Sequence, residues 1–561
     1  MAAKEPISFI GLGAMGFGMA THLIKEGYSV TGFDVWGPTL DRFKAAGGSA
    51  ASTPAQAVAD KPFCVCMVAT AQQAQAVLID GPDAAVPALP QGAVLMLCST
   101  VPCQYAQALD QQLRDMGRGD ILFVDCPVSG GAIRAADGTL SIMAGASDEA
   151  IAKGRDILQA MSDPAKLYIV AGGVGAGSNM KMCHQVLAAN QILSASEAMG
   201  FAAHLGLDLA KARDAILASD GKSWMFENRV PRILHPEHKP VASALTIILK
   251  DTSIITSEAR RRRFATPMTS AAEQAYFVGL GLGYGPDDDA GMLRVYTQGV
   301  GKVGPVQGAA ETDEAKVALV LALLEGIHLC SAAETLAFAD FVKLDLDQVF
   351  ELCTNAAGGS RMLDRFGPGI LAAFKSGVAA KGWETEAGVY DVTAAADRLQ
   401  AAVDEAQRLK MPLFLGTQAL NLLRTATRSL DGKASAGAVV KLWTIPGFRA
   451  GTSSSSLATV PEYLPSHNTA AAMEGFFAIV HLCRIISYLK DWLSGDGCSS
   501  DPGDATQPSI CGAQGSERDK KQNDPGRSRT CSLLMTEFNR SQTRYHYATG
   551  PLKKRLICQT M

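Results

Sequence analysis

Residues 173–185, GVGAGSNMKMCHQ, contain a lysine, a histidine and a glutamine whose types and spacing could serve proton transfer and substrate binding. Three glycines lead to Ser178, a residue type favoured at helix N-caps, and an apolar-periodic run follows it. Lys181 is therefore expected in the first turn of a long helix, with His184 and Gln185 on the same face. A cation there opposes the helix dipole, so partial desolvation should lower the pKa of Lys181 toward that of a proton shuttle. An isolated lysine with this spacing is more often a solvated surface residue, so the rest of the sequence must decide.

A second polar segment follows the apolar run at 121–125. The sequence DCPVSGG ends in Ser129, Gly130 and Gly131, so a hydroxyl group lies beside two unhindered backbone amides. Such a turn could hold a small carboxylate. A simple glycine turn explains the same residues equally well.

The N-terminal residues contain a dinucleotide-binding fingerprint. The strand-like run ISFI leads into GLGAMG and a helix, and a second strand-like run ends at Asp34, about 18 residues after Gly16. These glycines would allow a tight turn and close approach to a pyrophosphate, whose charge the helix N-terminus favours. Asp34 could accept from both ribose hydroxyls and would repel a 2′-phosphate, so NAD is favoured over NADP. The expected cofactor-binding residues are Asp34 and the loop of Gly11, Leu12, Gly13, Ala14, Met15 and Gly16.

Further apolar runs predict the rest of a doubly wound α/β domain. Most are continuously apolar, as strands buried on both faces of a parallel sheet require, and helical or turn-rich stretches separate them. We therefore expect a Rossmann domain over residues 1–176. The runs lie at 63–69, 93–98, 121–125, 140–144 and 166–171.

Three motifs occur in the order and spacing of one enzyme family. GLGAMG, DCPVSGGAIRAADGTLSIMAG and GAGSNMK resemble the β-hydroxyacid dehydrogenases, which include 3-hydroxyisobutyrate dehydrogenase and tartronate semialdehyde reductase. The resemblance covers residues 7 to about 296. It implies that an all-helical domain of the 6-phosphogluconate dehydrogenase type, over residues 177–300, follows the Rossmann domain.

The chain departs from the KxxNN pattern common in this family, since His184 and Gln185 follow Lys181. This KxxHQ variant, with SWMFENRVPRIL, LKD and GYGPDDDAGMLRVY, most resembles the members that oxidise L-threonate. The resemblance implies that Lys181 is the general acid and base and that the turn at 129–131 anchors the substrate carboxylate. It also implies that Thr100 and Lys250 lie near the cofactor.

Hydride transfer from a carbinol carbon to NAD requires that the hydroxyl proton leave as the carbonyl forms, and Lys181 could accept it. In the reverse direction the same ammonium would donate a proton and stabilise charge on oxygen. His184 and Gln185 could hydrogen-bond the additional hydroxyls of a sugar acid, although His184 could instead be a core histidine. We expect an NAD-dependent dehydrogenase for L-threonate or a related four-carbon acid. A 3-hydroxyisobutyrate dehydrogenase or tartronate semialdehyde reductase, and an inactive NAD-binding interaction module, are the alternatives.

An internal repeat indicates that the helical domain occurs twice. Residues 190–234 align with 326–371, and the similarity continues to 291–296 against 438–443. We expect a degenerate second copy over residues 315–445. Such a copy could bury within one chain the surface that a partner subunit would otherwise cover, giving a monomeric pseudo-dimer; a homo-oligomer is the alternative.

The second copy lacks the candidate catalytic groups in this alignment. Four small or apolar residues replace them, so catalysis is expected only in the first copy. Ala318, Leu321, Ala322 and Ala395 take the positions of Lys181, His184, Gln185 and Lys250.

The composition restricts the class of protein further. The 561 residues have 19% charged side chains and a net charge of -4, so we expect no nucleic-acid partner. We expect no membrane-spanning helix, because no apolar run approaches the length of a membrane span. The first expected strand begins at Ile7 and leaves no space for a signal or transit peptide, so we expect a cytoplasmic protein. The 13 cysteines show no CxxC spacing, and the one close pair, Cys64 and Cys66, lies in an apolar strand-like run, so they predict neither disulfides nor a metal site. Residues 446–561 have no globular pattern and are expected to be disordered, as an extended gene model would be.

Overall fold

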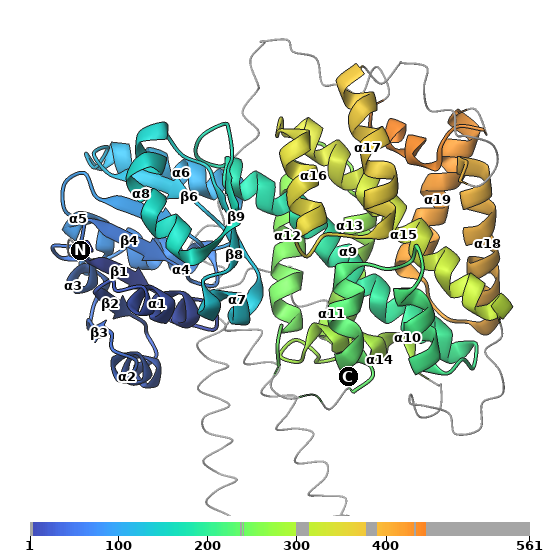
Figure 1. Ribbon diagram of the computed structural model, residues 1–561, viewed down its shortest axis with the longest axis horizontal. Helices are drawn as coiled ribbons and strands as arrows, with labels where there is room; N and C mark the ends of the chain where they lie inside the picture. The colour runs from blue at the N-terminus through green and yellow to red at the C-terminus, as the bar shows by residue number, and fades with distance from the viewer. Residues whose placement is uncertain are drawn as a thin grey trace, which may run out of the picture. The chain divides into compact units, whose positions relative to one another are not determined.

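The computed structural model describes residues 4–235, 238, 241–298, 314–376, 390–430 and 433–444 (Figure 1). These residues belong to one compact unit, Met1–Thr452. The disorder expected for residues 446–561 concerns residues outside the described ranges.

A six-stranded parallel sheet forms the core of the N-terminal domain, with the strand order β3-β2-β1-β4-β5-β6. Every residue of β1, β4 and β5 is buried, in agreement with their continuously apolar sequences. Successive strands are added toward one edge of the sheet from β1 to β3 and toward the other edge from β4 to β6. The switch point of this strand order lies between β1 and β4, where α/β sheets of this kind bind nucleotides. The strands are β1 (Ile7–Ile10), β2 (Val30–Phe33), β3 (Ser49–Ala50), β4 (Phe63–Cys66), β5 (Val94–Leu97) and β6 (Leu122–Asp125).

Helices cover both faces of this sheet and create two separate hydrophobic cores. Phe9 and Val65 belong to the core beneath α1, α7 and α8, whereas Ile10 and Cys64 belong to the core beneath α3, α4, α5 and α6. The predicted Rossmann fold is therefore present. The helices of the domain are α1 (Gly16–Lys25), α2 (Gly37–Ala45), α3 (Pro54–Val58), α4 (Ala71–Leu78), α5 (Ala85–Ala88), α6 (Cys103–Asp115), α7 (Gly131–Asp137) and α8 (Asp148–Met161).

The runs at 140–144 and 166–171 do not extend the large sheet, contrary to the simplest interpretation of the sequence. They lie in a second, three-stranded sheet made of β7 (Val128–Ser129), β8 (Leu140–Ala144) and β9 (Ser162–Ile169). β7 pairs antiparallel with β8, and β8 pairs parallel with β9. A bridge between Asp125 and Gly145 joins the two sheets. The sequence pattern identified apolar strands but could not specify which sheet they join.

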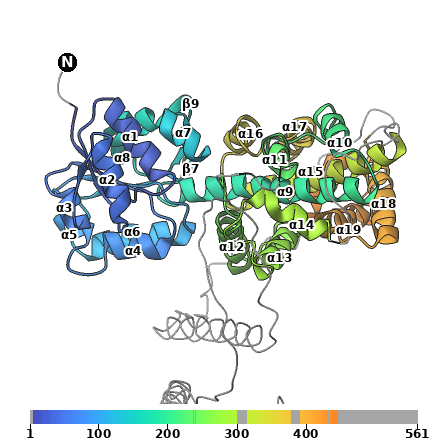
Figure 2. The same ribbon diagram turned by 90° about the horizontal axis from the view of Figure 1, so that it is seen from below.

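The long helix α9 (Ala176–His204) runs through the helical body, with α15 (Glu314–Phe341) packed beside it (Figure 2). Nearly all of α9 is buried, because helices from both halves of the body surround it. α15 is long and apolar enough to cross a membrane by length and composition, which the sequence was not expected to contain, but most of it is buried within the protein. Its apolar surface packs against α9, α17 and α18, so α15 is a core helix of this fold.

The remaining helices form two similar sets, coloured green and yellow to orange in Figure 1. The first set is α10 (Leu209–Leu217), α11 (Trp224–Ile233), α12 (Leu245–Arg261), α13 (Pro267–Gly281), η1 (Asp289–Met292) and α14 (Leu293–Tyr296). The second set is α16 (Leu346–Asn355), α17 (Arg361–Ser376), α18 (Val392–Leu409), α19 (Phe414–Ser429) and η2 (Ala436–Trp443). The predicted repetition of the all-helical architecture is therefore visible in the order of the helices.

Two buried glutamates join the sets reciprocally. Glu197 of α9 accepts from the backbone N–H of Leu415 (3.2 Å) and Gly416 (2.8 Å) at the start of α19. Glu334 of α15 accepts from the N–H of Met268 (2.8 Å) and of its neighbour, residue 269 (3.0 Å), at the start of α13. Since α9 belongs to the first helical copy and α15 to the second, each copy caps a helix of the other. Burial raises the pKa of both carboxyl groups to about 7.

Candidate active site

The GLGAMG loop follows β1 at the point where the sheet order reverses. Gly11 has φ +92°, and a Cβ there would lie 2.3 Å from the carbonyl oxygen of Met67. A Cβ on Gly16 would lie 1.9 Å from the carbonyl oxygen of Gly11, whereas one on Gly13 would meet nothing within 4 Å. The first and third glycines are therefore required by the close turn, and Gly13 faces open space that a pyrophosphate could occupy.

Asp34 follows β2 and lies against this loop. Its carboxylate accepts from the N–H of Leu12 (2.7 Å) and of Trp36 (2.8 Å). Two backbone amides thus fix the orientation of the carboxylate, whose remaining lone pairs could accept from a ribose. The loop containing Ala14 and Met15 ends where α1 begins, so the predicted cofactor residues before Thr100 lie together. This arrangement fits a dinucleotide.

Lys250 connects the helical body to the carboxyl edge of the sheet. From α12, its Nζ donates to the carbonyl oxygens of Ala69 (3.2 Å) and Thr100 (3.3 Å), just beyond β4 and β5. It also pairs with Asp251 at 3.1 Å. The structure therefore brings together Thr100 and Lys250, two residues that are 150 positions apart in the sequence.

The turn at Ser129, Gly130 and Gly131 connects β7 to α7. Ser129 is almost buried, and the two glycines have φ angles of 145° and 73°. A Cβ on Gly131 would meet nothing within 4 Å, so the turn borders open space. β7 begins three residues after Asp125, whose carboxylate binds the first turn of α9.

Lys181 is only 5% exposed and lies in the second turn of α9, not in the first as the sequence predicted. The helix begins three residues earlier than expected because Gly175, not Ser178, occupies the N-cap position and Asp125 supplies the capping carboxylate. Burial lowers the pKa of Lys181 to about 8, with Asp251 opposing the shift and Lys250 adding to it. The predicted direction is therefore present, with desolvation as the main cause.

A chain of hydrogen bonds orders the two polar residues after Lys181. Gln185 Nε2 donates to Asp251 Oδ2 at 2.6 Å, which turns Gln185 Oε1 toward His184 Nδ1 at 3.0 Å. Since that oxygen can only accept, His184 carries its proton on Nδ1. Its Nε2 is then an acceptor, and it has no hydrogen-bond partner among the described residues. Burial, followed by the nearby Lys181, lowers the pKa of His184 to about 3, so the imidazole is neutral.

Two buried aspartates of this site were missed by the sequence reasoning. Asp251 accepts from Gln185 and pairs with Lys250. The only sequence signal for it was its position beside the lysine in the motif LKD. Asp125 ends β6 and binds the first turn of α9. Its place at the end of an apolar strand was visible, but its partners 50 and 53 residues away were not.

The described part of the chain contains no group of three or more His, Cys, Asp and Glu side chains that could hold a metal ion. The cysteines described there are free and buried.

The structure corrects one correspondence between the two helical copies. The bridge between Ala244 and Asp288 in the first copy is repeated 147 residues later, between Asp391 and Ser435 in the second. The helices that follow, α12 and α18, begin at Leu245 and Val392 with the same offset. The counterpart of Lys250 is therefore residue 397, an aspartate, and not the alanine at 395. A sequence alignment without these bridges placed the gap wrongly.

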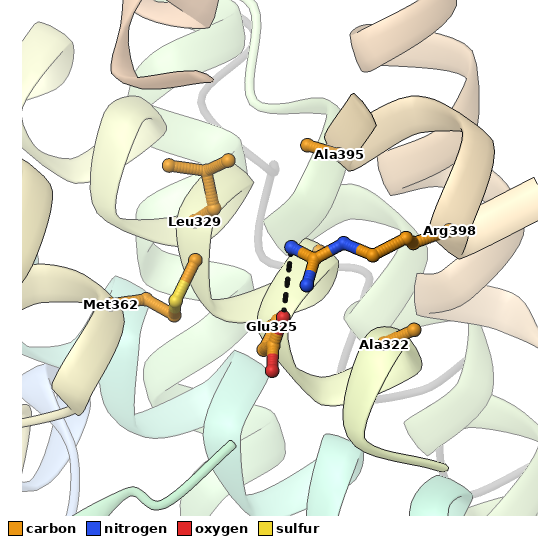
Figure 3. A pocket seen from close by; sticks show the side chains of 7 residues that line it. Ala322, Glu325, Leu329, Met362, Ala395 and Arg398 are labelled. Carbon is orange, nitrogen blue, oxygen red and sulfur yellow. Dashed lines mark ion pairs between the residues drawn. The ribbon is translucent and has the colours of Figure 1, made fainter. Parts of the chain in front are cut away.

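The second copy contains a small cavity at the counterpart of the candidate site (Figure 3). Its volume is about 10 Å³, which is room for about one water molecule. Ala322 replaces Gln185 there, and Arg398, at the position of Asp251, pairs with Glu325 at 3.1 Å. The cavity is lined by Ala322, Glu325, Gly326, Leu329, Met362, Ala395 and Arg398.

Comparisons with known families agree with this arrangement. The family model described as the NAD binding domain of 6-phosphogluconate dehydrogenase matches residues 6–173. The model described as NAD-binding of NADP-dependent 3-hydroxyisobutyrate dehydrogenase matches twice, at residues 175–296 and 313–443. The chain belongs to the family of NAD-dependent hydroxy-acid dehydrogenases that includes 3-hydroxyisobutyrate dehydrogenase.

Individual relatives make the likeness more specific. L-threonate dehydrogenase of Cupriavidus necator is 38% identical over 290 residues, which are 52% of this chain and 95% of the relative. Mitochondrial 3-hydroxyisobutyrate dehydrogenase of Mus musculus is 29% identical over 300 residues, covering 52% of this chain and 88% of the relative. A structure of Plasmodium falciparum 6-phosphogluconate dehydrogenase, 17% identical with a TM-score of 0.53, has a similar fold over 75% of this chain and 92% of its own.

Proposed function

We propose that this protein oxidises L-threonate or a related four-carbon sugar acid, with NAD as the hydride acceptor and Lys181 as the general base. The observation that carries the proposal is the buried lysine with a pKa of about 8, beside an ordered imidazole whose Nε2 has no hydrogen-bond partner in the part of the chain that the structure describes. The similarity to L-threonate dehydrogenases supports the choice of substrate. Catalysis belongs to the first helical copy, since the second has alanine at position 318.

The residues that would hold the cofactor are those of the Rossmann domain and Lys250. The amides of the loop 11–16 and the start of α1 would bind the pyrophosphate, and Asp34 would bind the adenosine ribose. Thr100 and Lys250 lie at the carboxyl edge of the sheet, where the nicotinamide would be placed. When bound, NAD accepts the hydride from the carbinol carbon.

Lys181 would hold and move the proton. In the neutral form its Nζ has a lone pair that accepts the hydroxyl proton as the carbonyl forms, so oxidation needs the deprotonated lysine. In the reverse direction the ammonium donates that proton to the carbonyl oxygen. A pKa of about 8 leaves both forms populated near neutral pH.

The carboxylate and the additional hydroxyls of the substrate have separate partners in this proposal. The amides and hydroxyl of the turn at 129–131 would bind the carboxylate. His184 Nε2 would accept from a substrate hydroxyl, since an unpaired buried acceptor is costly and a hydroxyl satisfies it. Gln185 has protein partners at both ends of its amide, so it would act on the substrate by holding His184 in this tautomer. An acid without the second hydroxyl would leave the imidazole unpaired.

The test measures formation of NADH or NADPH by the full chain with NAD or NADP and each of four acids: L-threonate, D-erythronate, 3-hydroxyisobutyrate and glycerate. Reduction of tartronate semialdehyde is followed as consumption of the reduced cofactor. We expect NAD-dependent oxidation of a four-carbon sugar acid, with kcat lowered about 100-fold or more by Lys181→Ala. A preference for 3-hydroxyisobutyrate or tartronate semialdehyde would replace the proposed substrate. NAD binding without turnover of any acid would show that the chain is a binding module.

A further inference from the structure

Asp125 lies where the Rossmann sheet meets the helix that carries Lys181. It is the last residue of β6, and its side chain is fully buried. Oδ2 accepts from the backbone N–H of Gly175 (3.1 Å) and Ser178 (2.8 Å), and Oδ1 accepts from Ser178 Oγ (2.7 Å). One carboxylate from the nucleotide domain thus takes three donors from the first turn of α9.

The backbone at this junction is equally close. The N–H of Asp125 donates to the carbonyl oxygen of Gly145 (3.1 Å), and the Gly145 N–H donates back to Asp125 O (2.8 Å). A Cβ on Gly177 would lie 2.4 Å from the Asp125 carbonyl oxygen and 2.3 Å from that of Met143. The first turn of α9 is therefore pressed against the sheet, and it cannot slide without breaking the contacts of Asp125.

Ser178 precedes Lys181 by three residues on the same helix, so a displacement of the first turn displaces the lysine with it. The cofactor loop follows β1 and Thr100 follows β5, in the same sheet whose strand β6 ends at Asp125. Lys181 and His184 belong to α9. Hydride and proton transfer need both sets of groups within a fraction of an ångström of one geometry, and about 1 Å of misplacement costs roughly 100-fold in rate.

We propose that Asp125 is the positioning residue that sets Lys181 relative to the nicotinamide site. It touches neither substrate nor cofactor and acts through Ser178 and the start of α9. A negative group at a helix N-terminus is favourable, and here the partners are backbone and side-chain donors of a different domain. The inference rests on the proposed role of Lys181 as the general base.

The test compares Asp125→Ala with Asp125→Asn. Alanine removes all three acceptor contacts, whereas the Asn Oδ1 can accept from both amides while its Nδ2 donates to Ser178 Oγ. We expect Asp125→Ala to lower kcat roughly 100-fold, to leave the KM for NAD within about threefold, and to raise the isotope effect on kcat with L-threonate deuterated at its carbinol carbons. Asp125→Asn should recover most of the rate.

Asp208→Ala is the matched control, because Asp208 caps α10 through the N–H of Ala210 (2.8 Å) and Lys211 (3.0 Å), away from the junction. It should lower the melting temperature without changing kcat or the isotope effect. If Asp125→Ala behaves like this control, Asp125 is an ordinary helix cap and the inference is wrong. If Asp125→Ala does not fold, Ser178→Ala supplies the test, with kcat expected to fall about threefold to tenfold; unchanged kcat would overturn the inference.

The same assay separates this inference from the proposed function. Absence of wild-type turnover, or full activity of Lys181→Ala, contradicts the role of the lysine and with it the inference. Wild-type turnover that is lost in Lys181→Ala and retained in Asp125→Ala contradicts only the positioning role of Asp125.

Discussion

The two helical copies have the same order of helices and exchange the same kind of buried glutamate cap, yet their candidate sites differ in charge. In the first copy Lys250 and Asp251 follow each other on α12; in the second, the corresponding residues are an aspartate and Arg398. Lys181 is buried, and its counterpart Ala318 is exposed. The residues that stabilise the pair of copies are therefore repeated, whereas those that face the nucleotide domain are not.

This difference separates structural from chemical constraints. The caps made by Glu197 and Glu334 act between the copies, and both copies need them. Lys181, His184 and Asp251 have a role only where a cofactor-binding sheet lies against them. Among the described residues the Rossmann sheet precedes the first copy, and Lys250 of that copy contacts it.

The largest effect is expected from the lysine itself. Lys181→Ala should lower kcat for oxidation about 100-fold to 10,000-fold, the range for losing a general base. Ala318→Lys, the matched change in the second copy, should leave kcat unchanged because position 318 is exposed and, among the described residues, the predicted cofactor loop lies in the N-terminal domain. Steady-state rates with NAD and L-threonate would measure both, and an effect of Ala318→Lys would contradict the assignment of catalysis to the first copy.

The pH profile should show that Asp251 raises the pKa of Lys181 and so opposes the lowering caused by burial. Oxidation in the wild type should rise with pH through about 8, as the ammonium loses its proton. Asp251 raises the pKa of Lys181, so Asp251→Asn should move this rising limb to lower pH. It should also lower kcat/KM about 10-fold to 100-fold because Gln185 loses a charged partner.

Arg398→Ala is the control for this change, because Arg398 occupies the corresponding position in the second copy and pairs with Glu325. Its pH profile should match the wild type. A rising limb that stays in place in Asp251→Asn would show that the carboxylate does not influence the lysine.

The buried glutamates should make stability depend on pH. Their pKa values are raised to about 7, so the folded state binds protons that the unfolded chain has released above its own pKa of about 4.5. The free energy of unfolding should therefore fall as pH rises from about 4.5 to about 7. Glu197→Gln and Glu334→Gln should each reduce this fall by a similar amount.

Denaturant unfolding of the full chain at several pH values would measure this effect. Equal changes in the two variants are expected from the reciprocal contacts, with each variant destabilising by about 1–3 kcal/mol at acid pH, where an amide replaces a neutral carboxyl group in its backbone contacts. A large effect of one variant alone would contradict the equivalence of the two caps.

The smallest effect concerns the contact of the second copy with the nucleotide domain. Gln348 of α16 donates to the carbonyl oxygen of Ile169 in β9 at 3.0 Å. Gln348→Ala should lower the free energy of unfolding by about 1 kcal/mol and change kcat little. Lys211 in α10 is the matched position, and among the described residues its side chain makes no hydrogen bond to the nucleotide domain. Lys211→Ala should therefore leave the same unfolding curve unchanged.

The features predicted correctly from the sequence depend on residues close together in the chain. The alternation of apolar runs and turns predicts the strands, and GLGAMG predicts the nucleotide loop. A lysine near a helix N-terminus predicts the direction of its pKa shift, whereas its burial, the main cause of that shift, is visible only in the structure. The offset between the two helical copies could not be predicted from neighbouring residues, because a short gap in the alignment moves the counterpart of Lys250 by two residues. Only the bridges from Ala244 and Asp391 fix that register.

The sequence by itself determined the local elements and the types of chemical groups available, because helix and strand periodicity and glycine-rich turns act over a few neighbouring residues. The tertiary structure decided which groups meet. Asp125 reaches Ser178 across 53 residues, Gln185 reaches Asp251 across 66, and Lys250 reaches Thr100 across 150. Such pairs depend on how sheets and helices pack, and the packing is set by burial of apolar surface spread over the whole chain.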